Sequence, residues 1–147
     1  MKLIKYLKIK KMVKLINVDI KVKFAKRLEC EPENAKIYVG FKNNEMENRT
    51  FKDYVKELQP NVCKYSDMLL GVLHEIGHIY TIEQADESEY LQDVDLLYKL
   101  REKDLISAEQ MNYFYLRLPL ESLATKWAID FININKAFCD KWDNELM

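Results

Sequence analysis

One apolar stretch, from Met68 to Ile82, constrains the fold of this 147-residue chain more than any other part of it. It reads MLLGVLHEIGHIYTI, which is long enough for four helical turns, and Ser66 or Asp67 stands before it as a candidate N-cap. At about 100° per residue, its apolar side chains point in almost every direction. A helix that is apolar all round is buried. We therefore predict a buried helix over this stretch.

Three ionisable residues, His74, Glu75 and His78, interrupt the middle of this apolar helix. Burying an ionisable group without a partner is costly, so each of these side chains needs one. His74 and His78 are four residues apart, which places both imidazoles on one face with Cβ atoms about 5–6 Å apart. Two ring nitrogens so placed can bind one metal ion at about 2.0–2.1 Å. The alternative is a pair of core histidines that hydrogen-bond to backbone or carboxylate groups.

The pattern His-Glu-x-x-His, which the chain has at residues 74–78, is the motif of the zinc peptidases called zincins. Glu75 lies about 100° round the helix from His74, so its carboxylate can take a proton from a water bound to the metal. Both histidines of the chain fall inside the motif. We therefore predict Zn2+ held by His74 and His78, with Glu75 as the catalytic base.

A third zinc ligand has to be a carboxylate from elsewhere, because catalytic zinc usually has three protein ligands and no third histidine exists. Glu121 is the best candidate. The small residues Ala124 and Ala128 share its helix face, and Gly77 adds no side chain to the motif helix next to His78, so the two helices can approach closely. Thr125, on the same face, can hydrogen-bond a ligand. The alternative for Glu121 is a first-turn glutamate that only compensates the helix dipole. Three rival acids follow the motif too closely to fold back easily: Glu83, Asp86 and Glu87.

The chain before the motif alternates apolar and polar residues, which predicts a small sheet. Ile16 to Phe24 is expected to form one strand and Lys36 to Phe41 a second, with a turn at residues 31–34. A third strand around Asn48 to Phe51 is weaker, and Phe51 to Leu58 fits a short helix equally well.

The chain after the motif follows helical spacing. An acidic amphipathic helix is expected around Glu83 to Asp95, and another helix behind a capping box of Ser107 and Gln110. A last helix is expected from about Leu120 to Trp142. Only 3 Gly and 3 Pro are present, which favours long helices over a turn-rich β-sandwich. The predicted fold class is therefore α+β: one mostly helical domain over residues 1–147, with a small N-terminal sheet of two or three strands packed on the motif helix.

The motif followed by a helix reading Glu-x-x-Ala-x-x-Trp-Ala at residues 121–128 resembles the gluzincin metallopeptidases, and most of all the small ImmA/IrrE-type family. The resemblance implies a minimal zincin-like fold, zinc held by His74, His78 and Glu121, and Glu75 as the catalytic residue. It also implies a protein substrate, which in that family is often a transcriptional repressor. This chain departs from the family in having 43 residues between His78 and Glu121, and Thr125 where asparagine is more usual.

The function that we predict is a zinc-dependent metallopeptidase acting on a protein or peptide. A tyrosine is expected to stabilise the oxyanion, with four candidates: Tyr113, Tyr115, Tyr80 and Tyr38. The strand at Lys36 to Phe41 is expected to pair with an extended substrate, as an edge strand would. The first alternative is a non-catalytic zincin-fold protein that acts as a protein-interaction module. The second is a helical module without metal, in which the motif is accidental.

Charge and cysteine content bear on partners and compartment. The chain has 23 Lys and Arg against 24 Asp and Glu, so no direct nucleic-acid binding is expected. No window approaches the roughly 18 apolar residues of a membrane span. Three widely spaced cysteines, Cys30, Cys63 and Cys139, favour free thiols in the cytoplasm. The lysines of Met1 to Lys14 predict a solvated basic face, with contact to an acidic partner or an anionic surface as the alternative.

Overall fold

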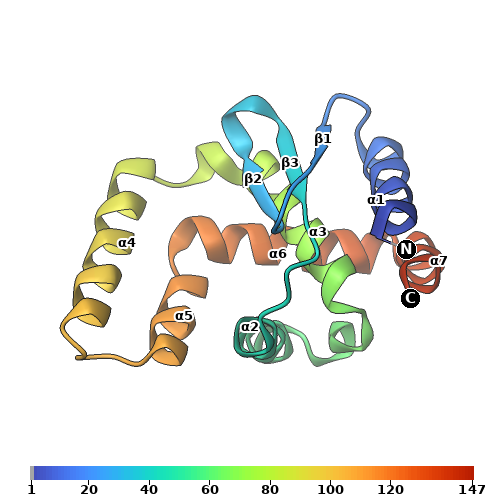
Figure 1. Ribbon diagram of the computed structural model, residues 1–147. Helices are drawn as coiled ribbons and strands as arrows, with labels where there is room; N and C mark the ends of the chain where they lie inside the picture. Colours follow the sequence, from blue (N-terminus) through green and yellow to red (C-terminus); the bar gives the residue numbers. More distant parts are fainter. Residues whose placement is uncertain (1) are drawn as a thin grey trace.

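The computed structural model describes residues 2–147 as seven α-helices and a small sheet, which confirms the mostly helical α+β class. Figure 1 shows α6 crossing the middle of the molecule, with the sheet beside α3. The elements in chain order are α1 (Lys2–Ile16), β1 (Lys21–Phe24), β2 (Glu29–Glu31), η1 (Pro32–Asn34), β3 (Lys36–Val39), α2 (Glu45–Leu58), η2 (Pro60–Lys64), α3 (Asp67–Thr81), η3 (Ile82–Gln84), α4 (Glu87–Glu102), α5 (Ala108–Leu116), α6 (Pro119–Ile134) and α7 (Lys136–Leu146).

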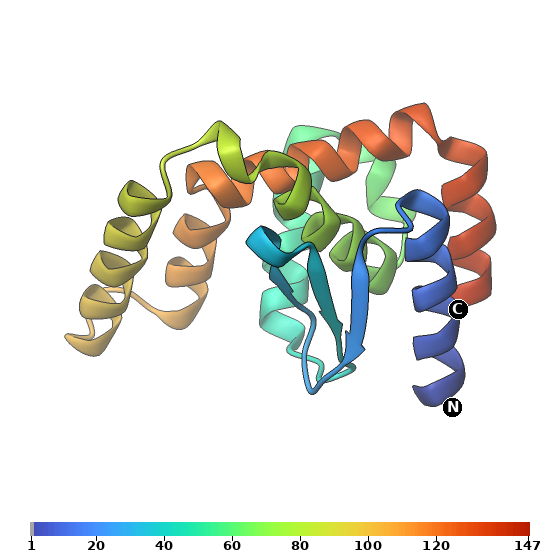
Figure 2. The ribbon, with the colours of Figure 1, turned by 90° about the horizontal axis from the view of Figure 1, so that it is seen from above.

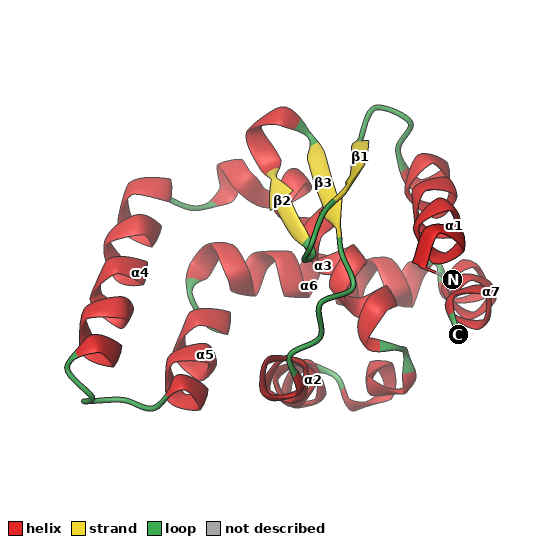
Figure 3. Cartoon of the chain, viewed as in Figure 1, coloured by secondary structure: helices red, strands yellow, loops and turns green. Residues whose placement is uncertain are grey.

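The two ends of the molecule are unlike each other. Helices α4 and α5 lie side by side as an arm at one end, and α1 lies beside α7 at the other end, where both termini are found (Figures 1 and 2). Between them, the sheet packs on α3 through β2 and β3 (Figure 3). Across the part of the chain that the structure describes, no helix is both long enough and apolar enough to span a bilayer.

The sheet has the strand order β1-β3-β2, with β1 parallel and β2 antiparallel to β3. The strand expected from Ile16 begins only at Lys21, because residues up to Ile16 belong to α1. The apolar residues of α1 that are buried, Ile9, Met12 and Val13, follow helical spacing and pack into the core. The alternation that starts at Ile16 therefore overlaps the end of a helix and a turn.

The second expected strand is confirmed as β3, but it occupies the centre of the sheet rather than an edge. The third strand expected at Asn48 to Phe51 is wrong, because these residues lie inside α2, which Asn44 caps by accepting a hydrogen bond from Glu47 N. The actual third strand is β2, of sequence Glu-Cys-Glu. Three residues without apolar alternation carry no local strand signal, so only the pairing with β3 defines this strand.

Several helix ends follow the sequence closely. Ser66 caps α3 by accepting from Leu69 N at 3.2 Å, and the capping box of Ser107 and Gln110 is present at the start of α5. The single last helix is instead two helices, α6 and α7, that break at Asn135. The acidic helix starts at Glu87 rather than Glu83, and Leu97 is its one buried residue.

The core forms around α3, whose apolar side chains are buried on nearly all sides, as its composition predicts. Helix α6 crosses α3 at close range. A Cβ on Gly77 would lie 2.4 Å from the backbone oxygen of Ala124, so only glycine permits this approach. Ala124 and Ala128 are buried on the facing side of α6, as expected. This close crossing brings the first turn of α6 to the motif.

Candidate metal centre

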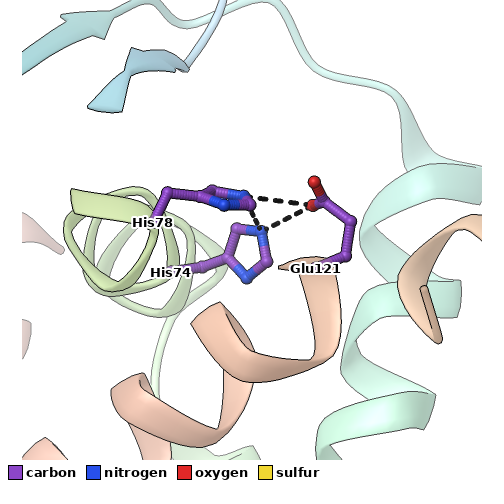
Figure 4. A group of neighbouring side chains, drawn as sticks. All are labelled: His74, His78 and Glu121. Carbon is purple, nitrogen blue, oxygen red and sulfur yellow. Dashed lines mark hydrogen bonds and ion pairs between the residues drawn. The ribbon is translucent and has the colours of Figure 1, made fainter. Parts of the chain in front are cut away.

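Three side chains from α3 and α6 meet at the crossing of the two helices (Figure 4). His74 and His78 project from α3, and Glu121 lies in the first turn of α6, which Pro119 starts. The two Nε2 atoms are 3.1 Å apart, and Glu121 Oε1 lies 3.1 Å from His74 Nε2 and 3.2 Å from His78 Nε2. Within residues 2–147, this is the one group of three or more His, Cys, Asp or Glu side chains that could hold a metal ion.

Thr125 determines which ring nitrogen of His74 carries the proton. Its hydroxyl donates to the backbone carbonyl of Glu121 at 3.1 Å, so its oxygen accepts from His74 Nδ1 at 3.0 Å. A neutral His74 then has a lone pair on Nε2, which faces Glu121 and His78. The threonine thus hydrogen-bonds the candidate ligand His74, as the sequence predicts, from a position that is fully buried.

The donor set fits a zinc ion. A lone pair of His74 and the carboxylate of Glu121 converge with His78 Nε2, and such a cluster repels itself unless a proton or a metal cation lies between the atoms. Ligand atoms that are each about 2.0–2.1 Å from a tetrahedral zinc ion lie about 3.3 Å from one another. The observed spacings of 3.1–3.2 Å need almost no rearrangement to reach that value. Two imidazoles and one carboxylate are also a ligand set of catalytic zinc sites.

Charge within the cluster shifts two pKa values. Burial alone would raise the pKa of Glu121, but the hydrogen bonds and charges of His74 and His78 hold it well below its usual range. Burial alone would lower the pKa of His78, but its hydrogen bond to Glu121 and the charge of that carboxylate raise it. Glu121 therefore stays ionised, which a metal ligand requires.

Two tyrosines hold the other oxygen of Glu121. Tyr90 on α4 and Tyr115 on α5 both donate to Oε2, at 2.9 and 3.1 Å, and their hydroxyl oxygens lie 3.1 Å apart. Burial and the charge of Glu121 raise the pKa of both hydroxyls, which keeps them protonated donors. The arm thereby fixes the carboxylate with Oε1 turned toward the imidazoles. Tyr115 is among the tyrosines singled out from the sequence, whereas no local pattern marks Tyr90 in its acidic helix.

The other three tyrosines singled out from the sequence lie away from the centre. Tyr80 stacks on Trp127, and Tyr38 donates to Glu31. Tyr113 packs against the guanidinium of Arg117 and is exposed. Among the four candidates for oxyanion stabilisation, the structure brings only Tyr115 to the cluster.

Glu75 lines the same cavity as the three residues of the cluster. It follows His74 on α3, is half-buried, and its carboxylate makes no hydrogen bond to any described residue. Burial raises its pKa, although the neighbouring histidines act in the opposite direction. A carboxylate without a described protein partner, beside a candidate metal-binding cluster, is free to exchange a proton with a water or a substrate.

The cavity measures about 860 Å³ and lies between the sheet edge and the α4–α5 arm. Its walls include Glu29 and Cys30 of β2, Phe51 of α2, whose ring meets His74 edge-on, and Met111 of α5. The strand at this wall is β2, an edge of the sheet, whereas residues 36–39 form the central strand β3 and offer no free edge for the pairing expected of them.

The three rival acids are not ligands in this arrangement. Asp86 caps α4 by accepting from Ser88 N and Glu89 N, and Glu83 lies in η3. Glu87 lines the cavity but lies outside the cluster.

A comparison of the chain with models of known protein families, with curated proteins and with solved structures finds no match.

Proposed function

We propose that this protein is a zinc-dependent metallopeptidase that hydrolyses a peptide bond in a protein substrate. The observation that carries the proposal is the convergence of His74, His78 and Glu121 within 3.2 Å, beside the unpartnered carboxylate of Glu75. A purely structural cluster has no need of the cavity or of a free acid next to its histidines. A catalytic site requires both.

The residues divide the chemistry among them. Zinc, when bound by the cluster, acts as a Lewis acid that lowers the pKa of water and polarises the substrate carbonyl. The Glu75 carboxylate accepts the proton of the attacking water and later delivers it to the leaving amine. Thr125 orients the His74 ring, and Tyr90 and Tyr115 orient Glu121. An extended substrate pairs with the free edge of β2, which places its backbone across the cavity.

The substrate and compartment belong to the same proposal. The resemblance to the ImmA/IrrE-type family favours a protein substrate such as a transcriptional repressor. Cys30, Cys63 and Cys139 are free thiols, which supports a reducing compartment such as the cytoplasm.

The test combines zinc content with cleavage of a quenched fluorescent peptide library. We expect the wild type to carry one zinc per chain and to cleave library members. Glu75→Gln should keep its zinc and lose cleavage, whereas Glu121→Ala should lose zinc as well. Glu87→Gln is the matched control, because Glu87 lines the same cavity outside the cluster and its loss should leave both properties unchanged.

The outcomes separate the alternatives. Turnover by Glu75→Gln at the wild-type rate would contradict the role of Glu75. Stoichiometric zinc without cleavage of any library member would favour the non-catalytic interaction module. Absence of zinc from protein purified without chelator would favour an accidental motif.

A further inference from the structure

Helix α1 presents large apolar side chains to solvent on the side that faces away from the core. Leu3, Ile4 and Leu7 lie on one side of the helix and are 64%, 54% and 53% exposed. The opposite side buries Ile9 and Met12 in the core. The exposed residues therefore do not support the fold of this molecule, and they leave a strip of apolar surface uncovered.

Phe24, at the end of β1, adds a separate exposed aromatic ring near the start of α1. Phe24 is 57% exposed, meets the ring of Tyr6 edge-on at 5.4 Å between centroids, and lies 6.3 Å from the ring of Phe41. A shallow groove runs between the two elements and is lined by Lys2, Phe24, Ala25, Lys26, Phe41 and Lys42. We call the surface formed by Leu3, Ile4 and Leu7, with Lys10 and Lys11 three and four residues after Leu7 on the same side of the helix, the α1 face.

The segment that begins with α1 is strongly positive. Residues 1–42 hold twelve Lys and Arg against four Asp and Glu, although the whole chain has a net charge of -1. Helix α1 itself contains no acid. Eight exposed lysines of this region form no ion pair with any described residue: Lys2, Lys5, Lys10, Lys11, Lys21, Lys23, Lys26 and Lys42. Their charge is therefore available to an external partner.

We propose that the α1 face binds the surface of an anionic phospholipid membrane, with α1 lying in the plane of the interface. Helices that lie on bilayers combine large apolar side chains, which enter the headgroup boundary, with lysines that attract anionic lipids. The α1 face has both. The proposal does not depend on the metal centre or on catalysis.

Nucleic acid fits this surface less well. Recognition of phosphates and base edges relies heavily on arginine, whose planar guanidinium forms paired hydrogen bonds, whereas the cations surrounding Leu3, Ile4 and Leu7 are all lysines. Exposed leucine and isoleucine side chains gain nothing from a phosphate backbone, but they gain apolar surroundings at a bilayer. The α4–α5 arm is at the far end of the molecule from α1 (Figure 2), so a membrane bound at the α1 face leaves the arm free.

Vesicle sedimentation tests the proposal. The full chain is mixed with vesicles of phosphatidylcholine alone, or of phosphatidylcholine with phosphatidylglycerol, at low and at high salt. We expect binding to the anionic vesicles that weakens with salt, and little binding to the neutral ones. Leu3→Ser with Leu7→Ser should lower partitioning about tenfold or more, and Lys10→Glu with Lys11→Glu should lower it similarly.

The matched control is Leu91→Ser with Leu96→Ser on α4, because these leucines are 57% and 55% exposed at the opposite end of the molecule. This variant should bind vesicles as the wild type does, and circular dichroism checks that every variant is folded. Three results would overturn the proposal: no binding to anionic vesicles at low salt, equal loss of binding in the control, or tighter binding to a DNA duplex than to vesicles. Dimerisation that the Leu3 and Leu7 changes abolish, without vesicle binding, would assign the α1 face to a second copy of the chain.

Discussion

The hydroxyl of Tyr90 provides a sharp test of how the arm supports the candidate metal centre. Tyr90→Phe keeps the ring and removes only the group that donates to Glu121 Oε2 at 2.9 Å. Tyr115 still donates to the same oxygen, so Glu121 is not left without a partner. The carboxylate loses one of the two bonds that orient Oε1 toward the histidines. We therefore expect weaker zinc binding with an intact fold.

The size of the effect follows from the chemistry of that bond. A hydrogen bond to a charged group contributes about 1.5–3 kcal/mol. Each 1.4 kcal/mol is about a tenfold change in an equilibrium constant. Part of the lost free energy is recovered when the remaining hydrogen bond, from Tyr115 to Glu121, strengthens. The zinc Kd should therefore rise about 10–100-fold, as for other residues that orient metal ligands. Changing Tyr90 and Tyr115 together should have a larger effect than the sum of the single changes, because each compensates for the other.

Competition with a chromophoric chelator measures the zinc Kd directly. Tyr98→Phe is the matched control, since Tyr98 lies on the same helix, lines the same cavity and makes no hydrogen bond to any described residue. It should bind zinc as the wild type does. If Tyr90→Phe also binds within twofold of the wild type, the arm does not position Glu121 and this reasoning is wrong.

Two further predictions concern packing and pH. Gly77→Ala places a methyl group 2.4 Å from the Ala124 backbone oxygen and should destabilise the fold by about 1–3 kcal/mol, measured by urea unfolding. In the control Gly71→Ala, the methyl group meets only a movable leucine side chain and should change stability by less than about 1 kcal/mol, so equal effects of the two changes would refute the argument. Burial and two nearby carboxylates raise the pKa of Cys139 from about 9 to about 11, so the folded state favours the neutral thiol. The stability that this provides is present below pH 9 and is lost as pH rises toward 11, and the unfolding free energy of Cys139→Ala should fall less over that range.

Much of the candidate site could be predicted because its signals are local. The i, i+4 spacing of His74 and His78 determines their common face, and the apolar run around them determines that the face is buried. Glu121 could be selected because Ala124 and Thr125 stand at helical spacing from it on a face that permits close approach. Tyr90 could not be found in this way, since nothing in the sequence around it indicates that α4 returns to the motif.

In the fold, too, local elements could be predicted from the sequence, whereas elements that depend on distant partners could not. Capping patterns and helical periodicity mark α3 and the start of α5 in the sequence itself, because a helix forms its hydrogen bonds within one segment. The three-residue strand β2, the central place of β3 and the break between α6 and α7 depend on partners remote in sequence. The sequence by itself thus determined the motif helix and the common face of its two histidines. Only the tertiary structure decided which strand edge and which tyrosines stand beside them, because strand pairing and the docking of the arm are made by contacts between distant segments.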